Sequence, residues 1–424
     1  MSETGAGAIR VSTGGIFAAL AIGLVLGAVL PRVAPSAMPM VLAVAGSVGQ
    51  LWLHALQMTI VPLVAALLFS GIAATYAAAR AGRLARRALM MFFVILFAGA
   101  VVAAIAMPLL LALAPIPSGA ADALRGGLAT AEPGRVPTLA DFAEALVPTN
   151  VLAAAAADAI LPLIVFVSFF AVAAMRLATP QRELLVGLFD AIGNAMLVVI
   201  SWVLLAAPLG VLALSISVAG QNGGAAIGAL AHYIVVVTIV GVIVLIAAYV
   251  VAIAVARLRP AEFARAMLPA QAVALSTQSS LASLPAMLGA CRRLGVPEAT
   301  ADLVMPLAVA LFRATGPAMN LAVAIYVAHW FGVPLTPQVL AAGVAVATLT
   351  TIGAVSLPGA ISFVSSIGPI ALAMGVPVAP LALLVAVEVF PDLMRTLANV
   401  TMDVAVTAAV ARGKAAEAVS APGD

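Results

Sequence analysis

The chain has 424 residues, of which 65% are hydrophobic and only 8% are charged, and its formal net charge is +3. Soluble domains carry about 25% charged residues, so this composition excludes a soluble globular protein and indicates a polytopic membrane protein. The basic residues form short clusters between apolar runs, which is typical of a topology signal and not of a nucleic-acid surface. The single cysteine, Cys291, excludes a disulfide framework and a cysteine-based metal site.

Six apolar stretches are long enough to cross about 30 Å of hydrocarbon as helices. They are roughly Gly15–Leu30, Val41–Ala73, Ala88–Leu113, Leu152–Ala174, Leu184–Ser217 and Ala225–Ala256. The second is too long to stand upright, so we expect it to be tilted. The segment Ala114–Asn150, between the third and fourth stretches, is rich in Pro, Gly and Ala and predicts a long exposed loop.

The arginines predict the orientation in the membrane. Clusters follow the second, fourth and sixth stretches: Arg80, Arg83, Arg86, Arg87, Arg176, Arg182, Arg257, Arg259 and Arg265. The loops on the other side hold only Arg32, Arg125 and Arg135. Because cytoplasmic loops are enriched in Lys and Arg, we expect a multi-pass protein of the plasma (inner) membrane with both termini in the cytoplasm.

The next segment changes character, because Phe263–Ser276 and Leu281–Leu294 are apolar arms too short to span. At about 14 residues each, they reach about 21 Å as helices. They meet at Thr277-Gln278-Ser279-Ser280, and arginines flank both outer ends. This predicts a re-entrant helical hairpin that enters from the cytoplasmic side with a serine-rich tip.

A spanning helix, about Ala299–Trp330, is expected next, with Arg313 and a break at Thr315-Gly316-Pro317. A second hairpin follows, Gln338–Ile352 and Ala360–Met374, with its tip at residues 353–359. Its uncharged flanks predict entry from the outside. With a last helix, about Pro380–Ala411, the fold class is an all-α polytopic membrane protein with eight transmembrane helices, two re-entrant hairpins and inverted repeats.

The last helix carries a row of polar residues, Glu388, Asp392, Arg395, Asn399 and Asp403, spaced to share one helical face. On insertion scales a charge at the bilayer centre costs roughly 2.5–3.5 kcal/mol, so the row must face the protein interior or a cavity. It predicts a transport or binding site. The alternative is a structural ion-pair network, Arg395 with Asp392 and Arg313 with Asp403. Pro391 is expected to kink the helix near Asp392.

Several motifs resemble those of the dicarboxylate/amino acid:cation symporter family, which includes the glutamate transporters. They are Pro148-Thr149-Asn150, Leu161-Pro162, Ser279-Ser280, Leu284-Pro285, Leu357-Pro358-Gly359, and Arg395-Thr396 followed by Asn399-Val400-Thr401 and Asp403. The resemblance implies an elevator-type transporter in a lipid bilayer, usually a homotrimer, without a cofactor. It also implies a scaffold, mainly residues 14–75 and 148–218, and a transport domain, mainly residues 87–114 and 224–412.

The resemblance also implies roles for individual residues. Arg395 corresponds to the residue that grips a substrate carboxylate, and Asp392 to the acceptor of its α-ammonium group. Further substrate contacts are implied for Thr396, Asn399, Ser279, Ser280, Ser356 and Gly359. Asp403 corresponds to a carboxylate that ligates sodium, with Asn399 as a possible second ligand.

Two departures concern the cation sites. The family's Asn-Met-Asp-Gly-Thr motif corresponds here to Phe312-Arg313-Ala314-Thr315-Gly316, and the third span around Phe92-Phe93 lacks the usual tyrosine and hydroxyl residues. Two of the usual sodium sites are therefore expected to be unfilled. Arg313, which is always protonated, is expected to substitute for a cation beside Asp403 and Asp392.

A fixed arginine returns in every cycle and supplies no driving force, whereas moving one negative charge inward costs about 2.3 kcal/mol per 100 mV. We therefore expect coupling to protons, through Glu388 or Asp392, in preference to sodium. Substrate exchange or an anion-conducting channel remains the alternative. Acidic amino acids and C4-dicarboxylates both fit. No enzyme is expected: as an aspartyl dyad, Asp392 and Asp403 would stand about 16 Å apart along one helix, too far to share a proton.

Overall fold

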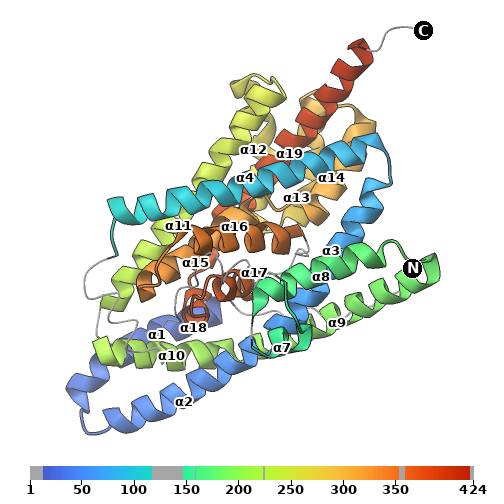
Figure 1. Cartoon of the computed structure of the whole chain (residues 1–424). Helices are drawn as coiled ribbons and strands as arrows, with labels where there is room; N and C mark the ends of the chain where they lie inside the picture. The colour runs from blue at the N-terminus through green and yellow to red at the C-terminus, as the bar shows by residue number, and fades with distance from the viewer. Residues whose placement is uncertain (1–12, 117–146, 158, 223–224, 353–358, 421–424) are drawn as a thin grey trace.

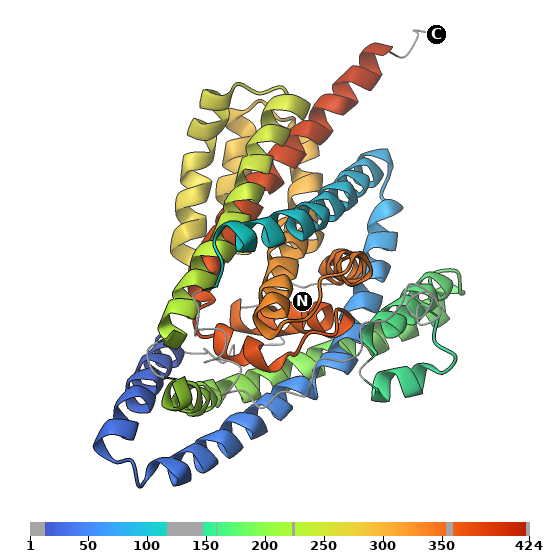
Figure 2. The ribbon, with the colours of Figure 1, turned by 60° about the vertical axis from the view of Figure 1, so that its left-hand side comes forward.

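The computed structural model describes residues 13–116, 147–157, 159–222, 225–352 and 359–420. Within these ranges the chain consists of helices and short connections, with no β-strand. Figure 1 shows two groups of helices: α1, α2 and α7 to α10 lie along the lower side, and α4, α11 to α16 and α19 lie above them. The rotated view in Figure 2 keeps this division. The all-α prediction is thus confirmed for the described residues.

The lower group contains several broken helices. Its members, with α3 leading up to the other group, are α1 (Thr13–Val33), α2 (Met38–Gln57), α3 (Ile60–Ala79), α7 (Val151–Ala156), α8 (Ile160–Ala174), α9 (Thr179–Leu205) and α10 (Ala207–Asn222). The second, fourth and fifth predicted stretches were each expected as one helix, and each is two. At the first break the Thr59 hydroxyl donates to the Leu56 carbonyl at 2.7 Å. Such side-chain bonds to local backbone compete with helix continuation.

The upper group holds the longest helices and both hairpins. Its members are α4 (Arg83–Leu113), α11 (Ala225–Val250) with a π-helical extension η1 (Val251–Val255), α12 (Pro260–Thr277), α13 (Ser280–Arg293), α14 (Glu298–Leu311), α15 (Thr315–Phe331), α16 (Pro337–Ile352), α17 (Gly359–Ala373), α18 (Ala379–Leu384) and α19 (Val389–Ser420). The most extensive pairings are α11 with α19 and α4 with α15 here, and α1 with α10 in the lower group.

Both predicted hairpins are present as packed helix pairs. In the first, α12 and α13 pack together and are joined by Gln278 and Ser279 alone. Gln278 ends α12 in the left-handed region at φ +51°, and the Ser279 hydroxyl accepts from the Ala282 N–H at 3.2 Å. The arm α12 has 18 residues, longer than predicted. In the second hairpin α16 packs on α17, and its tip, residues 353–358, lies outside the described residues.

Two helix breaks lie beside the predicted site, and both correct the sequence interpretation. The break near Arg313 covers residues 312–314, so Thr315 starts α15 and does not belong to the break. The last helix is not continuous, because a turn over residues 385–388 separates α18 from α19. Glu388 therefore precedes α19. Pro391 is the third residue of α19, where its missing N–H removes no intrahelical bond, since first-turn N–H groups have no intrahelical partner.

Six stretches among the described residues are long and apolar enough to cross a membrane. They are Met38–Ala79, Arg83–Leu113, Thr179–Leu205, Gly228–Val255, Glu298–Trp330 and Val389–Gly413. Shorter apolar helices, among them Ile160–Ala174 and Pro337–Ile352, lie beside them. The chain is thus a multi-pass membrane protein, and the count of eight spanning helices stays a prediction.

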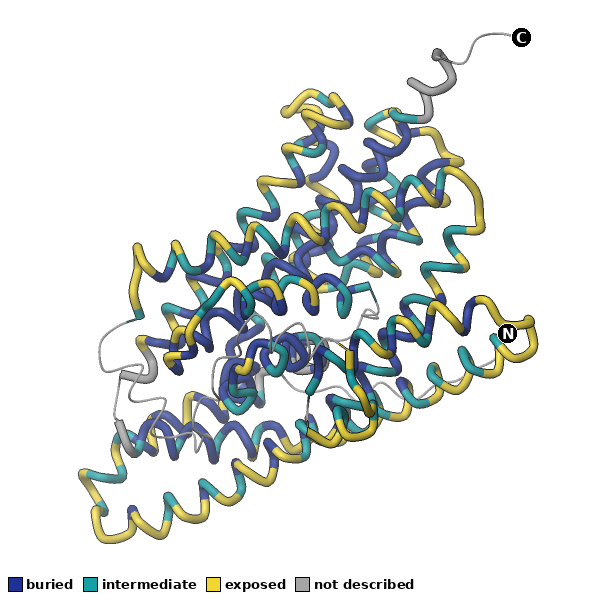
Figure 3. Tube along the Cα trace, in the orientation of Figure 1, coloured by how far each residue is buried: buried dark blue, intermediate teal, exposed yellow. Residues whose placement is uncertain are grey.

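Burial is concentrated where the helices of the two groups meet. Figure 3 shows the deepest burial along the central helices, whereas α2, α4 and α9 expose one side. In α15 only His329 is not buried. In the lower group, α2 and α10 approach closely at Gly210, where an added Cβ would lie 2.2 Å from the Trp52 indole. The Trp52 Nε1–H donates to the Val203 carbonyl at 2.9 Å, which holds the ring there.

We therefore predict that Gly210→Ala destabilises the protein, because the added methyl group forces the Trp52 ring aside, and overpacking costs about 1–3 kcal/mol. The matched control is Gly46→Ala in α2, where no atom lies within 4 Å of an added Cβ. Helix propensity alone favours alanine over glycine at both positions. Thermal unfolding in detergent should show a lower Tm for Gly210→Ala only; equal Tm values for the two variants would contradict this packing.

Candidate substrate and coupling site

The centre of the site is Arg395 on α19, whose guanidinium has three partners. Its NH2 group donates to Glu388 Oε1 at 2.7 Å, its NH1 group donates to Asn320 Oδ1 at 2.7 Å, and its Nε lies 3.5 Å from Asp392 Oδ1. The sequence predicted, as one alternative, an ion pair between Arg395 and Asp392. The shorter ion pair is with Glu388, because the turn before α19 carries Glu388 back toward the guanidinium.

Two partners in this cluster were missed by the sequence analysis. Asn320 lies on α15, and Tyr233, on α11, is completely buried and donates its hydroxyl to Glu388 Oε2 at 3.0 Å. The Tyr233 ring packs edge-on against Tyr326 of α15, with ring centroids 5.4 Å apart. The available signal was a polar group inside a strongly apolar helix, which favours an interior position in a membrane protein.

The other predicted substrate residues on α19 lie next to Arg395. The Thr396 hydroxyl donates to the Asp392 backbone carbonyl at 3.0 Å. Asp392 faces two cationic side chains, since its charge interacts with Arg395 and with Arg313. The structure thus brings Arg395, Asp392 and Thr396 together, as the row of polar residues predicted.

Asn399 has a structural role that the sequence did not indicate. Its Oδ1 accepts from both the N–H and the hydroxyl of Thr315, each at 2.9 Å. A side-chain oxygen that accepts from first-turn N–H groups stabilises the start of a helix. Asn399 therefore holds the beginning of α15 against α19, and the oxygen expected to contact substrate or sodium already has two donors.

Arg313 lies within the α14–α15 break, and Asp403 lies on α19. Asp403 is 1% exposed, and its Oδ1 has no hydrogen-bond partner among the described residues. The charge of Arg313 interacts with Asp403 and Asp392. This agrees with the expected placement of a fixed cation near both carboxylates.

An aromatic pair occupies the side of the break that faces α4. Phe312 is buried and stacks on Phe92, with ring centroids 4.4 Å apart and an interplanar angle of 9°. Both rings are core residues, Phe92 being 3% exposed. Carbon rings offer no oxygen ligand to a hard cation, so this part of the break cannot bind sodium through its side chains.

The hairpin tips contribute less to this cluster than expected. Ser279 caps α13, and Ser280 is its first residue. The Ser279 hydroxyl accepts from the Ala282 N–H, and the Ser279 carbonyl accepts from the Ser283 hydroxyl, both in the helix that Ser279 caps. Gly359 begins α17, and Ser356 lies outside the described residues. Contact of these tips with a substrate stays a prediction.

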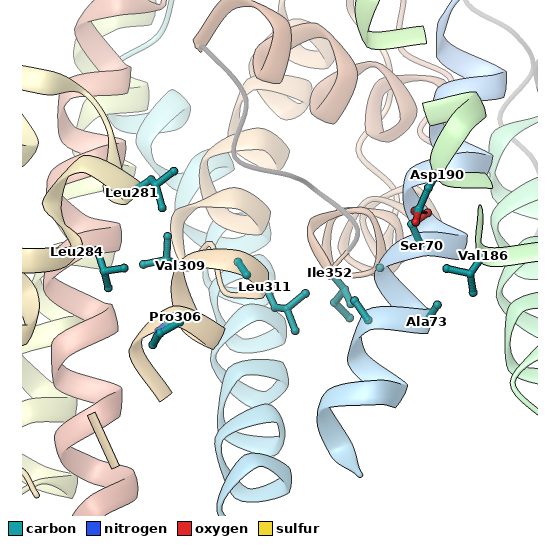
Figure 4. A pocket seen from close by; sticks show the side chains of 13 residues that line it. Ser70, Ala73, Val186, Asp190, Leu281, Leu284, Pro306, Val309, Leu311 and Ile352 are labelled. Carbon is teal, nitrogen blue, oxygen red and sulfur yellow. Dashed lines mark hydrogen bonds between the residues drawn. The ribbon is translucent and has the colours of Figure 1, made fainter. Parts of the chain in front are cut away.

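A cavity of about 590 Å³ lies between the two helix groups, beside the first hairpin. Figure 4 shows Leu281 and Leu284 of α13 on one side and Ser70 and Asp190, on α3 and α9, on the other. The Ser70 hydroxyl donates to Asp190 at 2.5 Å, and most of the remaining lining is apolar. Arg395 and its partners do not line this cavity. It separates helices that the sequence assigned to a scaffold from those assigned to a transport domain.

Residues 13–413 match the sodium:dicarboxylate symporter family. The chain belongs to this family. A proton/glutamate-aspartate symporter of Escherichia coli K12 is 26% identical over 412 residues, covering 94% of this chain and 91% of that protein. A proton/sodium-glutamate symport protein of Bacillus subtilis is 25% identical, covering 84% and 82%. An L-cystine uptake protein, TcyP, of Bacillus anthracis is 26% identical, covering 62% and 58%.

The family match confirms the resemblance drawn from the motifs around Arg395 and the hairpins. The relatives are named for two coupling ions, proton and sodium. Of the residues that correspond to the family motif, Phe312, Arg313 and Ala314 lie in the α14–α15 break. The identity of the coupling ion therefore depends on this chain's own side chains.

For this symporter we predict that Phe92→Ala lowers stability by about 3–5 kcal/mol, because it removes the buried partner of the Phe312 ring and leaves a cavity. The matched control is Phe93→Ala, the adjacent residue on α4, whose ring is 46% exposed. Thermal unfolding in detergent should separate the two variants by several degrees. Equal losses of stability would mean that the stacked pair does not support the break.

Proposed function

We propose that this symporter carries acidic amino acids or C4-dicarboxylates into the cell, coupled to a cation, with protons favoured over sodium. The observation that carries this proposal is the position of Arg395. Its guanidinium lies in the protein interior and has two carboxylates, Glu388 and Asp392, beside it. Arginine presents a planar set of donors that matches a carboxylate, and buried charges inside a membrane protein are typical of transport sites.

Asp392 favours a zwitterionic acidic amino acid, since its carboxylate can accept from an α-ammonium group while Arg395 binds the side-chain carboxylate. Asp392 also interacts with Arg313, so it already has a cationic neighbour without an α-ammonium group. A C4-dicarboxylate, which has no ammonium group, therefore also fits the site. Substrate contacts from Thr396, Asn399 and the tips Ser279, Ser280, Ser356 and Gly359 complete the proposed site.

An elevator mechanism in a homotrimer is the proposed mode of transport. Residues 14–75 and 148–218 form the scaffold, and residues 87–114 and 224–412 form the moving domain. The apolar cavity between α3, α9 and α13 supports this division, because loosely packed boundaries allow two groups of helices to slide. The protein is placed in the plasma membrane with both termini in the cytoplasm, as the arginine distribution favours.

Proton coupling is favoured over sodium by three features of the described residues. The Phe92–Phe312 stack fills one side of the break, and the Asn399 oxygen is bonded to Thr315. Arg313 adds a fixed positive charge near Asp403, which disfavours a second cation there. Substrate exchange without ion coupling, or anion conduction, is the second candidate, since a fixed arginine satisfies the charge balance without any transported ion.

We predict that Arg395→Ala weakens binding of acidic substrates at least tenfold, because a charged hydrogen bond contributes about 1.5–3 kcal/mol. A thermal-shift screen with aspartate, glutamate, succinate and malate measures this, since a bound ligand raises the Tm by mass action. Wild-type protein should be stabilised by at least one of the four, and Arg395→Ala by none.

Removing Arg395 alone leaves Glu388 buried without its cation, so the test is repeated in a Glu388→Gln background. Arg412→Ala, at an exposed position farther along α19, is the matched control for loss of an arginine. It should bind like the wild type. Unchanged affinity in both Arg395 variants would remove Arg395 from the substrate site.

A separate prediction concerns the coupling ion. In proteoliposomes with zero membrane potential, an inward proton gradient of one pH unit should drive about tenfold accumulation of the substrate found in the screen, without sodium, if one proton is coupled. A sodium gradient alone should give equilibration only. Strong concentrative uptake under the sodium gradient alone contradicts proton coupling, and failure of both gradients with intact counterflow identifies an exchanger.

A further inference from the structure

The carboxylate of Glu388 is held at both oxygens by different helices. Oε1 accepts from Arg395 on α19, and Oε2 accepts from the Tyr233 hydroxyl on α11. Glu388 is 3% exposed and Tyr233 is fully buried. This carboxylate is therefore a fixed part of the protein interior, and its charge depends on the arginine beside it.

The charged and titratable groups around Glu388 come from three elements. On its own side Arg395 and Asp392 interact with it, and Tyr233 faces it from α11. Beyond these direct neighbours, Tyr326 of α15 packs on Tyr233. Arg313, at the α14–α15 break, interacts with Arg395 and Asp392. The cationic side chain that bonds directly to Glu388 is Arg395.

A substrate carboxylate that binds Arg395 has to compete with Glu388 for the same guanidinium. The NH1 group donates to the neutral Asn320 amide and the NH2 group to Glu388, so a substrate carboxylate that binds these two nitrogens competes with Glu388 for the positive charge. If the substrate takes it, an ionised Glu388 is left buried with one neutral hydroxyl as its donor. A buried charge whose partner is removed is strongly unfavourable, by about 3–5 kcal/mol.

We propose that Glu388 is the proton carrier of this symporter, binding one proton when a substrate carboxylate replaces it at Arg395 and releasing that proton when the substrate leaves. This inference rests on the proposed function. It assigns the proton to one residue and makes proton and substrate binding obligatorily linked, since the single positive charge of Arg395 cannot neutralise both Glu388 and a substrate carboxylate.

The exchange balances in charge and atoms. Without substrate, Arg395⁺ and Glu388⁻ sum to zero. With substrate, the Arg395–Glu388 ion pair is broken, an ion pair between Arg395 and the substrate carboxylate forms, and a proton from the aqueous side adds to Glu388. Arg395⁺, the substrate carboxylate and neutral Glu388 again sum to zero. The Tyr233 hydroxyl can donate to Oε2 in both forms, so the side chain keeps its place.

Asp392 fits this role less well. Its carboxylate lies 3.5 Å from Arg395 Nε, its side chain is 15% exposed, and a second arginine, Arg313, also interacts with it. When a substrate binds Arg395, Asp392 therefore keeps a cationic neighbour and has less need of a proton. Glu388 loses the cation to which it bonds.

Proton uptake by purified protein tests the proposal directly. L-aspartate and succinate are added separately to wild-type protein in weakly buffered detergent solution with a pH indicator. About one proton per bound substrate should be taken up, and the apparent Kd should rise about tenfold per pH unit over the alkaline range. Substrate binding without proton uptake overturns the proposal while leaving the proposed function intact.

The decisive variant is Glu388→Gln, which imitates the protonated side chain. It should bind substrate with little pH dependence, take up no proton and retain counterflow, but lose accumulation driven by a proton gradient. The matched control is Glu262→Gln, at an exposed position in the first turn of α12, which should behave like the wild type.

The outcomes distinguish a failure of Glu388 as the proton carrier from a failure of the proposed function. If Glu388→Gln keeps proton uptake and Asp392→Asn loses it, the carrier is Asp392 and the proposal is wrong. If Glu388→Gln does not fold, the wild-type proton count and pH dependence still decide. If wild-type protein neither binds nor exchanges any of the acidic substrates, the proposed function itself fails.

Discussion

The structure depends on one requirement, that the buried guanidinium of Arg395 be neutralised. Taking an arginine out of water is unfavourable by several kcal/mol unless its donors are bonded and its charge is paired. Glu388, Asn320 and Asp392 meet this requirement from the turn before α19, from α15 and from α19 itself. These partners connect α15 with α19 and the turn before it. They also place carboxylates beside the guanidinium that an anionic substrate would bind. Under the proposed function, the same contacts serve both stability and selectivity for anions.

The helix breaks make this arrangement possible. A continuous last helix would carry Glu388 on the same face as Arg395 but nearly two turns away, about 10 Å along the axis. Glu388 ends the turn at residues 385–388, and its Oε1 lies 2.7 Å from the Arg395 NH2 group. On the opposite side, the start of α15 is held by the Asn399 oxygen through the N–H and hydroxyl of Thr315. Each break exposes polar backbone that must find partners within the protein, and the polar residues of α19 lie beside both breaks.

Much of the fold and part of the site could be predicted from the sequence. Long apolar runs and the 14-residue arms predicted helices and a hairpin around Ser279, and the spacing of Asp392, Arg395 and Asn399 predicted a shared face. The Arg395–Glu388 pair could not be predicted, because it depends on a turn in a run that is apolar on both sides. Partners on distant segments, Asn320 and Tyr233, carry no local signal that specifies which residue they meet. Such pairings are set by helix packing.

The residues at the α14–α15 break decide how the proposed cycle can be driven. Arg313 and the Phe92–Phe312 stack are permanent, so they contribute equally to the loaded and the empty protein and perform no net work. A driving ion has to bind in one half of the cycle and leave in the other. Among the charged groups described here, Glu388 has the geometry for that, because its partner is the group that a substrate would occupy. Under the proposed function, an arginine and an aromatic pair in place of a sodium site are compatible with coupling, because the driving ion then acts through a competition for Arg395.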